Sequence, residues 1–152
     1  MEKLRKIFLS RKEVTPDELK ELVTKLEEHG CEVKISDLEE ELSQMLENEE
    51  EIPFEEIEWC DIIFVLIGNS TDENDCVNKE IEEGSNQEKP IVGIYMGGNA
   101  ECVPKSLEDY GSGLITNDIN KITRILTGGK AQWEDEKGVS RKPKNTIDKS
   151  EC

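Results

Sequence analysis

The most apolar stretch of this chain of 152 residues is Ile62-Ile63-Phe64-Val65-Leu66-Ile67. A continuous run of β-branched and large apolar residues is typical of a central strand in a parallel sheet, because helices cover both faces of such a sheet. We therefore predict a central strand at residues 62–67, followed by a loop at residues 68–71. The rest of the sequence is interpreted outward from this strand.

Strand and helix patterns alternate on both sides of the central run. Four further strands are predicted, at residues 6–10, 31–35, 91–95 and 113–116. Helices are predicted from Thr15-Pro16 to Gly30, from Asp37 onward, and at residues 54–59, 75–85, 103–110 and 118–127. With right-handed crossovers, this alternation predicts a three-layer α/β domain around a parallel sheet of about five strands.

The length of the chain is that of one domain. We place this domain at residues 1–129. Residues 130–152 hold six basic and five acidic residues, few apolar ones and no period, so we predict a flexible C-terminal tail. Trp133 leaves two alternatives open within that tail, because it could pack back on the domain or form a short partner-binding motif.

The chain is strongly acidic, with 36 Asp and Glu against 19 Lys and Arg and a formal net charge of -17. Such a surface repels a phosphate backbone and an anionic membrane, so we expect neither nucleic-acid nor membrane binding. No apolar run approaches the ~20 residues of a membrane span, and the N-terminus lacks the pattern of a signal peptide. We expect a soluble, cytoplasmic protein.

Much of this charge lies between Asp37 and Glu58, where eleven residues are acidic and none is Lys or Arg. The run could be a solvated helix face and loop, or a docking surface for a basic protein partner. It lacks the pattern of a calcium loop, and the five cysteines are too widely spaced for a zinc site, so no metal is expected. Cys31 and Cys60 are interpreted as small buried hydrophobic residues.

Ligands of parallel α/β sheets bind beyond the carboxyl ends of the strands. Two loops therefore matter most: Ser10-Arg11-Lys12, after the first strand, and Gly68-Asn69-Ser70-Thr71, after the central strand. The phosphate-binding loop of nucleotide triphosphatases, the dinucleotide-binding glycine fingerprint and the hydrolase nucleophile elbow are all absent from the sequence.

Glu80 lies in the predicted helix after the second of these loops and shares a helix face with Cys76, one turn earlier. That face otherwise carries Val77 and Ile81, which places a carboxylate at the edge of a pocket or beside the core. The alternative is a solvated glutamate on a helix that also carries Glu82 and Glu83.

A family resemblance bears on whether Glu80 lies at a pocket or in solvent. Residues 60–71 resemble the central strand of Toll/interleukin-1 receptor (TIR) and TIR-like domains, and residues 76–84 resemble their next helix, where Trp-x-x-x-Glu is usual. Residues 89–95 and 6–11 are similar to two further strands. The resemblance covers roughly residues 4–127, is specific only over residues 59–95, and implies a flavodoxin-like, TIR-like fold.

The resemblance also implies a function. Enzymatic members cleave the nicotinamide–ribose bond of NAD, and some bacterial ones cyclise the ADP-ribose into an immune signal in antiphage defence. By resemblance, Glu80 would be catalytic, NAD a substrate rather than a cofactor, and a homo-oligomer or TIR-type assembly the expected state. The residues that would line the substrate pocket are Ser10, Arg11, Asn69, Ser70, Thr71 and Cys76.

Two alternatives stay open. The acidic run, and Cys76 at the place of the usual Trp, favour a non-catalytic TIR-like module that self-associates or recruits a partner. The third hypothesis is a nucleoside deoxyribosyltransferase-like, nucleotide-binding protein. Such proteins usually carry Ala-Gly-Pro after the first strand and Gly-Thr before the glutamate, whereas this chain has Leu9-Ser10-Arg11 and Asp75-Cys76.

Overall fold

The computed structural model describes residues 5–11, 16–35, 55–68, 75–97, 103–128 and 132–141. The predicted helix that starts at Asp37 and the predicted loop residues 69–71 lie outside these ranges.

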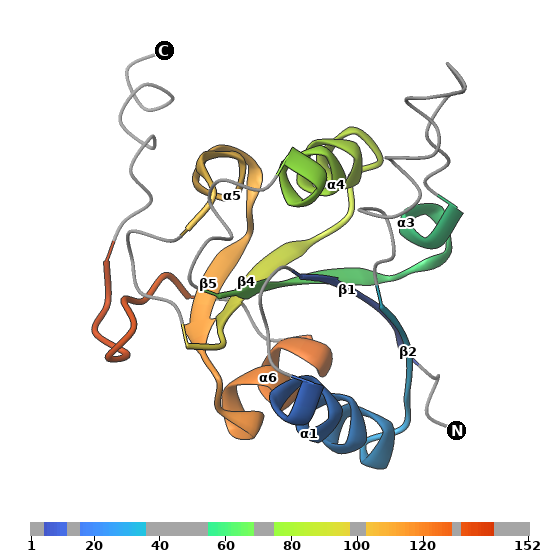
Figure 1. Cartoon of the computed structure of the whole chain (residues 1–152), viewed down its shortest axis with the longest axis vertical. Coiled ribbons are helices and arrows are strands. Elements are labelled where there is room, and N and C mark those ends of the chain that lie inside the picture. The colour runs from blue at the N-terminus through green and yellow to red at the C-terminus, as the bar shows by residue number, and fades with distance from the viewer. Residues whose placement is uncertain are drawn as a thin grey trace.

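The domain is built on one sheet of five parallel strands in the order β2-β1-β3-β4-β5 (Figure 1). The strands are β1 (Arg5–Arg11), β2 (Cys31–Ile35), β3 (Ile62–Ile67), β4 (Ile91–Tyr95) and β5 (Gly113–Thr116). The predicted α/β architecture with a central parallel sheet of about five strands is confirmed. The apolar run at residues 62–67 is the middle strand, β3, and all six of its residues are buried.

Helices cover both faces of this sheet. They are α1 (Pro16–Glu28), α3 (Glu55–Trp59), α4 (Asp75–Asn86), α5 (Lys105–Tyr110) and α6 (Ile119–Leu126). In Figure 1, α1 and α6 lie on one face, whereas α3, α4 and α5 lie on the other. No helix within the described ranges is long and apolar enough to cross a membrane.

Each face has its own hydrophobic core. Leu22 of α1 and Ile122 of α6 pack with Phe64 of β3 in one cluster. Val77 and Ile81 of α4 pack with Val65 of β3 in the other. The alternation of side chains along each strand divides its residues between the two cores. The three layers therefore follow from strand residues that are apolar on both faces.

Local sequence signals set several helix ends. Gly30 lies two residues after the end of α1 and has a φ of 82°, a conformation that glycine adopts without steric cost. The side chain of Asp118 accepts a hydrogen bond from the backbone N–H of Asn120 and so caps the start of α6. The Nζ of Lys89 donates to the carbonyl oxygens of Glu58 and Cys60 at the end of α3.

Gly93 lets α5 approach the middle of the sheet. A Cβ at this position would lie 2.6 Å from Leu107 Cδ2 and 2.6 Å from Leu114 Cδ1. We expect Gly93→Ala to lower the free energy of unfolding by about 1–3 kcal/mol, because both leucines must leave well-packed positions. Urea unfolding measures the change, and an unaltered midpoint would mean that both leucines repack without cost.

Residues 132–141 lie against β5, and we call this segment the clasp. Trp133 forms a parallel bridge with Leu114, and in Figure 1 the segment is drawn in red beside β5. The indole of Trp133 is partly buried against the core on the α4 side. We predicted a flexible tail for the stretch to which these ten residues belong. The structure instead agrees with the alternative that Trp133 packs back on the domain. Residues 142–152 lie outside the described ranges.

Candidate functional site

The central feature of the candidate site is a buried hydrogen bond between Ser10 of β1 and Glu80 of α4. The hydroxyl Oγ of Ser10 donates to Oε1 of Glu80 over 2.6 Å, and the two residues are 70 positions apart in the chain. Ser10 is fully buried and Glu80 is 2% exposed. The structure therefore rules out the interpretation of Glu80 as a solvated surface glutamate.

The backbone of β1 brings Ser10 to this place. Ile7 and Leu9 belong to the core on the α1 side, whereas Phe8 belongs to the core on the α4 side. Strand alternation then puts Ser10 on the same face as Phe8, below α4. Ser10 pairs with Val65 of the central strand near the carboxyl ends of both strands.

The buried face of α4 brings Glu80 to the same place. Val77 and Ile81, three residues before and one residue after Glu80, are fully buried in the core. Gly84 follows one turn later, and a Cβ on it would lie 2.4 Å from Ile63 Cδ1. The absence of a side chain at Gly84 lets α4 pack closely on β3, so Glu80 is held at the sheet.

The carboxylate of Glu80 can accept hydrogen bonds and stabilise a positive charge on a ligand. A carboxylate at the carboxyl ends of β1 and β3 concentrates negative charge where ligands of parallel α/β sheets bind. Its oxygens accept hydrogen bonds from hydroxyl groups, as the bond from Ser10 shows. In surroundings of low dielectric, the same charge stabilises a positive charge more strongly than it does in water.

For the other residues of the predicted pocket, the structure describes the backbone of two and none of the remaining three. Arg11 is the last residue of β1 and pairs with Leu66, and Cys76 is the second residue of α4. The side chains of these two residues lie outside the description, as do Asn69, Ser70 and Thr71 entirely. Of the predicted pocket, the structure therefore brings together Ser10 and Glu80, and the places of the others stay predictions.

A second buried polar cluster joins the clasp to the domain, and no pattern in the sequence predicts it. Both guanidinium nitrogens Nη1 and Nη2 of Arg141 bind the carboxylate of Glu108 in α5, at 3.0 and 2.9 Å. Oε1 of Glu134 accepts from Nζ of Lys121 at 2.9 Å and from the backbone N–H of Thr116 at 3.2 Å. The hydroxyl of Tyr95, at the end of β4, donates to the carbonyl oxygen of Glu134.

Burial and charge act against each other in this cluster. Burial alone would lower the pKa of Arg141, but the hydrogen bonds and the charge of Glu108 outweigh it, so the pKa of Arg141 is raised. Burial raises the pKa of the Tyr95 hydroxyl, and Arg141 partly offsets this rise. The guanidinium of Arg141 therefore keeps its charge beside Glu108 in spite of its burial.

A cavity of about 570 Å³ lies at the opposite end of the sheet, near the start of β1 and of β2. Its lining includes Arg5, Asp61 and the buried Cys31. Burial raises the pKa of Cys31, and burial raises the pKa of Cys60 to about 11. Both cysteines are free and buried, as predicted.

Only the end of the predicted acidic run falls within the described residues. Glu55, Glu56 and Glu58 lie on α3, where Glu55 and Glu58 are exposed and Glu56 is half-buried. The possible docking surface for a basic partner stays a prediction for the residues from Asp37 to Glu51.

Comparison with known proteins gives one family. The sequence model of the family described as "Thoeris protein ThsB, TIR-like domain" matches residues 13–101, which is more than half of the chain. The matched stretch includes Glu80 and ends before α5. Ser10 precedes it, and the clasp lies beyond it. No curated protein matches the chain.

Proposed function

The chain belongs to the TIR-like domain family of the Thoeris protein ThsB, a family of bacterial antiphage defence proteins, and on this premise we propose that it cleaves NAD. In this proposal NAD is the substrate, and the nicotinamide–ribose bond is the bond that breaks. The reaction takes place in the cytoplasm and yields an ADP-ribose-derived product that acts as an immune signal.

The observation that carries the proposal is the buried pair of Ser10 and Glu80. A carboxylate that is 2% exposed, and that accepts a hydrogen bond of 2.6 Å, is held in one position before any ligand arrives. Such preorganisation is what electrostatic catalysis requires, because the charge then needs no reorientation during the reaction.

The chemistry follows from the charge that develops on the substrate. When the bond between ribose C1′ and the nicotinamide nitrogen breaks, its electron pair leaves with neutral nicotinamide. The ribose then acquires oxocarbenium character, which the carboxylate of Glu80 stabilises. Water adds to C1′ and loses a proton to give ADP-ribose, or a hydroxyl of the same molecule adds to C1′, loses its proton and gives a cyclic product.

The remaining pocket residues take supporting roles in this proposal. Arg11 binds the diphosphate, because a guanidinium matches the geometry of phosphate oxygens. Asn69, Ser70 and Thr71 line the wall after the central strand, and Cys76 lies one turn before Glu80. We further propose that the active state is a homo-oligomer or TIR-type assembly, with Asp37–Glu58 available to a basic protein partner.

The direct test incubates the purified protein with NAD and follows nicotinamide release, together with the mass of the ADP-ribose product. We expect nicotinamide and either linear or cyclic ADP-ribose, with more product at protein concentrations that favour assembly. Absence of nicotinamide release at all concentrations, with no binding of NAD or ADP-ribose by calorimetry, would exclude the enzymatic function.

The non-catalytic alternative, which the acidic run and Cys76 favour, is compatible with the same buried pair. A hydrogen bond between β1 and α4 also stabilises the domain, so Ser10 and Glu80 serve a pure assembly module equally well. That alternative requires concentration-dependent association without any turnover of NAD. The family match gives no support to the deoxyribosyltransferase-like hypothesis.

A further inference from the structure

The cavity at the amino ends of the strands has the size of a small-molecule site. Its volume is about 570 Å³, within the range of about 300–1,000 Å³ that is usual for sites of small ligands. Arg5 and Cys31, the first residues of β1 and β2, pair with each other and line it. Leu126, the last residue of α6, also lines it. The cavity therefore lies between the starts of these strands and the helices that cover this face of the sheet.

The buried part of the lining is apolar and the exposed part is charged. Cys31 and Leu126 are each 8% exposed and belong to the core on the α1 side. Arg5 is exposed and Asp61 is half-buried. Strand alternation puts Arg5 on the same face as Ile7, toward α1. A ligand in this cavity therefore meets charged groups near solvent and an apolar surface against the core.

Arg5 and Asp61 present two opposite charges to the cavity. Burial raises the pKa of the Cys31 thiol, and the guanidinium of Arg5 partly offsets this rise, so the positive charge acts on a residue of the lining. The Oδ2 of Asp61 accepts the N–H of Lys6 at 3.0 Å, which fixes its carboxylate beside β1. Within the described part of the chain, no salt bridge occupies either Arg5 or Asp61. Both charges are therefore available to a ligand.

The uncharged polar side chains of the lining are acceptors. Nδ1 of His29 bonds the carbonyl oxygen of Lys25 at 2.8 Å, so this nitrogen carries the hydrogen and Nε2 of the neutral ring accepts. The hydroxyls of Thr123 and Thr127 donate to carbonyl oxygens of α6 at 2.6 and 3.1 Å, which leaves their lone pairs for a ligand. The C-terminal ends of α1 and α6 add partial negative charge. These groups favour a ligand that brings several N–H donors.

We propose that this cavity binds a small zwitterion, an amino acid or a dipeptide with an apolar side chain. The carboxylate of the ligand binds the guanidinium of Arg5, which matches its planar geometry. The ammonium group brings three N–H donors to Asp61 and the neighbouring acceptors. The apolar side chain packs on Cys31 and Leu126.

The charges of the lining select a zwitterion over an anion such as a phosphate ester. One cation and one anion complement a ligand of zero net charge, whereas a phosphate on Arg5 would share the cavity with the carboxylate of Asp61. The formal net charge of -17 also opposes the approach of a dianion. An amine without a carboxylate would leave the guanidinium without a partner.

The proposed site does not depend on cleavage of NAD. Arg5 precedes Ser10 by five residues in β1, so the two residues lie roughly 16 Å apart along the strand. The ligand contacts neither Ser10 nor Glu80. Binding of the zwitterion and release of nicotinamide can therefore fail separately.

The first test is calorimetry of the full chain with leucine and with glycyl-leucine. Leucinamide lacks the carboxylate, N-acetyl-leucine lacks the ammonium group, and inorganic phosphate is an anion alone. We expect leucine or glycyl-leucine to bind with a dissociation constant of about 1 mM or less. Each of the three controls should bind at least about tenfold more weakly, because each lacks one charged contact.

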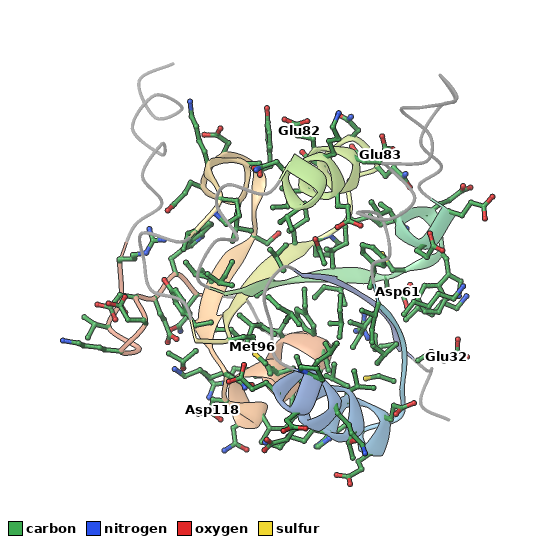
Figure 2. The ribbon with its side chains drawn as sticks, viewed as in Figure 1. Glu32, Asp61, Glu82, Glu83, Met96 and Asp118 are labelled. Carbon is green, nitrogen blue, oxygen red and sulfur yellow. The ribbon has the colours of Figure 1, made fainter. Side chains whose placement is uncertain are left out.

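The second test assigns the contacts with variants of the full chain. Arg5→Gln and Asp61→Asn each remove one charge, and the asparagine oxygen still accepts the N–H of Lys6. We expect each variant to weaken binding at least about tenfold. The matched controls are Arg124→Gln and Glu32→Gln, which remove exposed charges outside the lining and should bind as the wild type does. Figure 2 shows Glu32 directed away from the sheet.

Nuclear magnetic resonance locates the bound ligand. With leucine or glycyl-leucine, we expect the backbone amide signals of Cys31 and Thr127 to shift and that of Glu80 to stay in place. A shift at Glu80 without one at Cys31 would put the ligand at the other end of the sheet and overturn the proposal.

Three further results would overturn it. They are no binding of either zwitterion at roughly 10 mM, leucinamide or N-acetyl-leucine binding as tightly as leucine, and unchanged affinity in both Arg5→Gln and Asp61→Asn. If circular dichroism shows that a variant does not fold, the comparison of leucine with its two analogues on the wild-type chain decides.

Discussion

Replacement of Glu80 by glutamine is expected to slow nicotinamide release from NAD by roughly 10²–10³-fold, the range seen when one preorganised electrostatic contact to a transition state is lost. Glutamine has the size of glutamate, and its side-chain oxygen still accepts the hydrogen bond that Ser10 donates. The variant therefore removes the negative charge and keeps an acceptor for Ser10. Steady-state kinetics with NAD measures the effect.

The loss should appear in kcat rather than in KM. The positive charge on the ribose develops only as the bond to nicotinamide breaks, so bound NAD gains less from the carboxylate than the transition state does. A variant with unchanged kcat and raised KM would instead assign Glu80 to substrate binding.

Glu82→Gln is the matched control for this prediction. It removes the same charge from the same helix, and Figure 2 shows Glu82 and Glu83 on the outer side of α4, away from the sheet. Glu82 is exposed, whereas Glu80 is 2% exposed. Equal losses in the two variants would mean that net charge, rather than a carboxylate at the site, governs activity.

The sheet could be predicted from the sequence because each of its strands carries a local signal. The predicted strands at residues 31–35, 62–67, 91–95 and 113–116 have the bounds that the structure gives. Burial on both faces requires continuous apolar runs, and such runs are visible without knowledge of the partner strands. The alternation with helices then fixes a parallel arrangement.

The two residues of the contact between Ser10 and Glu80 could be singled out from the sequence for a different reason. No local pattern links residues 70 positions apart. The rule that ligands bind beyond the carboxyl ends of parallel strands directed attention to both, and the resemblance to TIR-like domains singled out Glu80. The catalytic role of Glu80 and the substrate-binding role of Ser10 stay predictions.

The clasp could not be predicted in the same way. Glu108 and Arg141 are 33 positions apart, and Glu134 and Lys121 are 13 apart, with no apolar period between the members of either pair. Buried ion pairs depend on which charges the fold brings together, and a sequence rich in charge offers many combinations. Trp133 was the residue that could have indicated a contact between this segment and the domain, because a large aromatic side chain is usually buried at least in part.

One row of residues connects the candidate site to the clasp. Ser10 pairs with Val65, Val65 with Gly93, Gly93 with Leu114, and Leu114 with Trp133. The row crosses four of the five strands at one level, from β1, which carries Ser10, to the covered edge at β5. The clasp and the candidate site therefore lie at the same level of the sheet.

The packing of α4 against the sheet is tested by replacing Ile81, which directly follows Glu80 and is fully buried. We expect Ile81→Ala to lower the free energy of unfolding by about 2–5 kcal/mol, because it removes packed methyl groups and leaves a cavity. Ile81→Val, the matched control, removes one carbon and should cost about 0.5–1.5 kcal/mol. Urea unfolding at constant pH measures both variants.

The two variants also separate stability from catalysis. Ile81→Val keeps α4 on the sheet, so its rate of nicotinamide release should stay near that of the wild type. Ile81→Ala loosens the helix that holds Glu80 and should lose activity at urea concentrations below its own unfolding midpoint. If Ile81→Ala lost activity only in step with global unfolding, the position of Glu80 would depend on the whole domain rather than on the contact between α4 and β3.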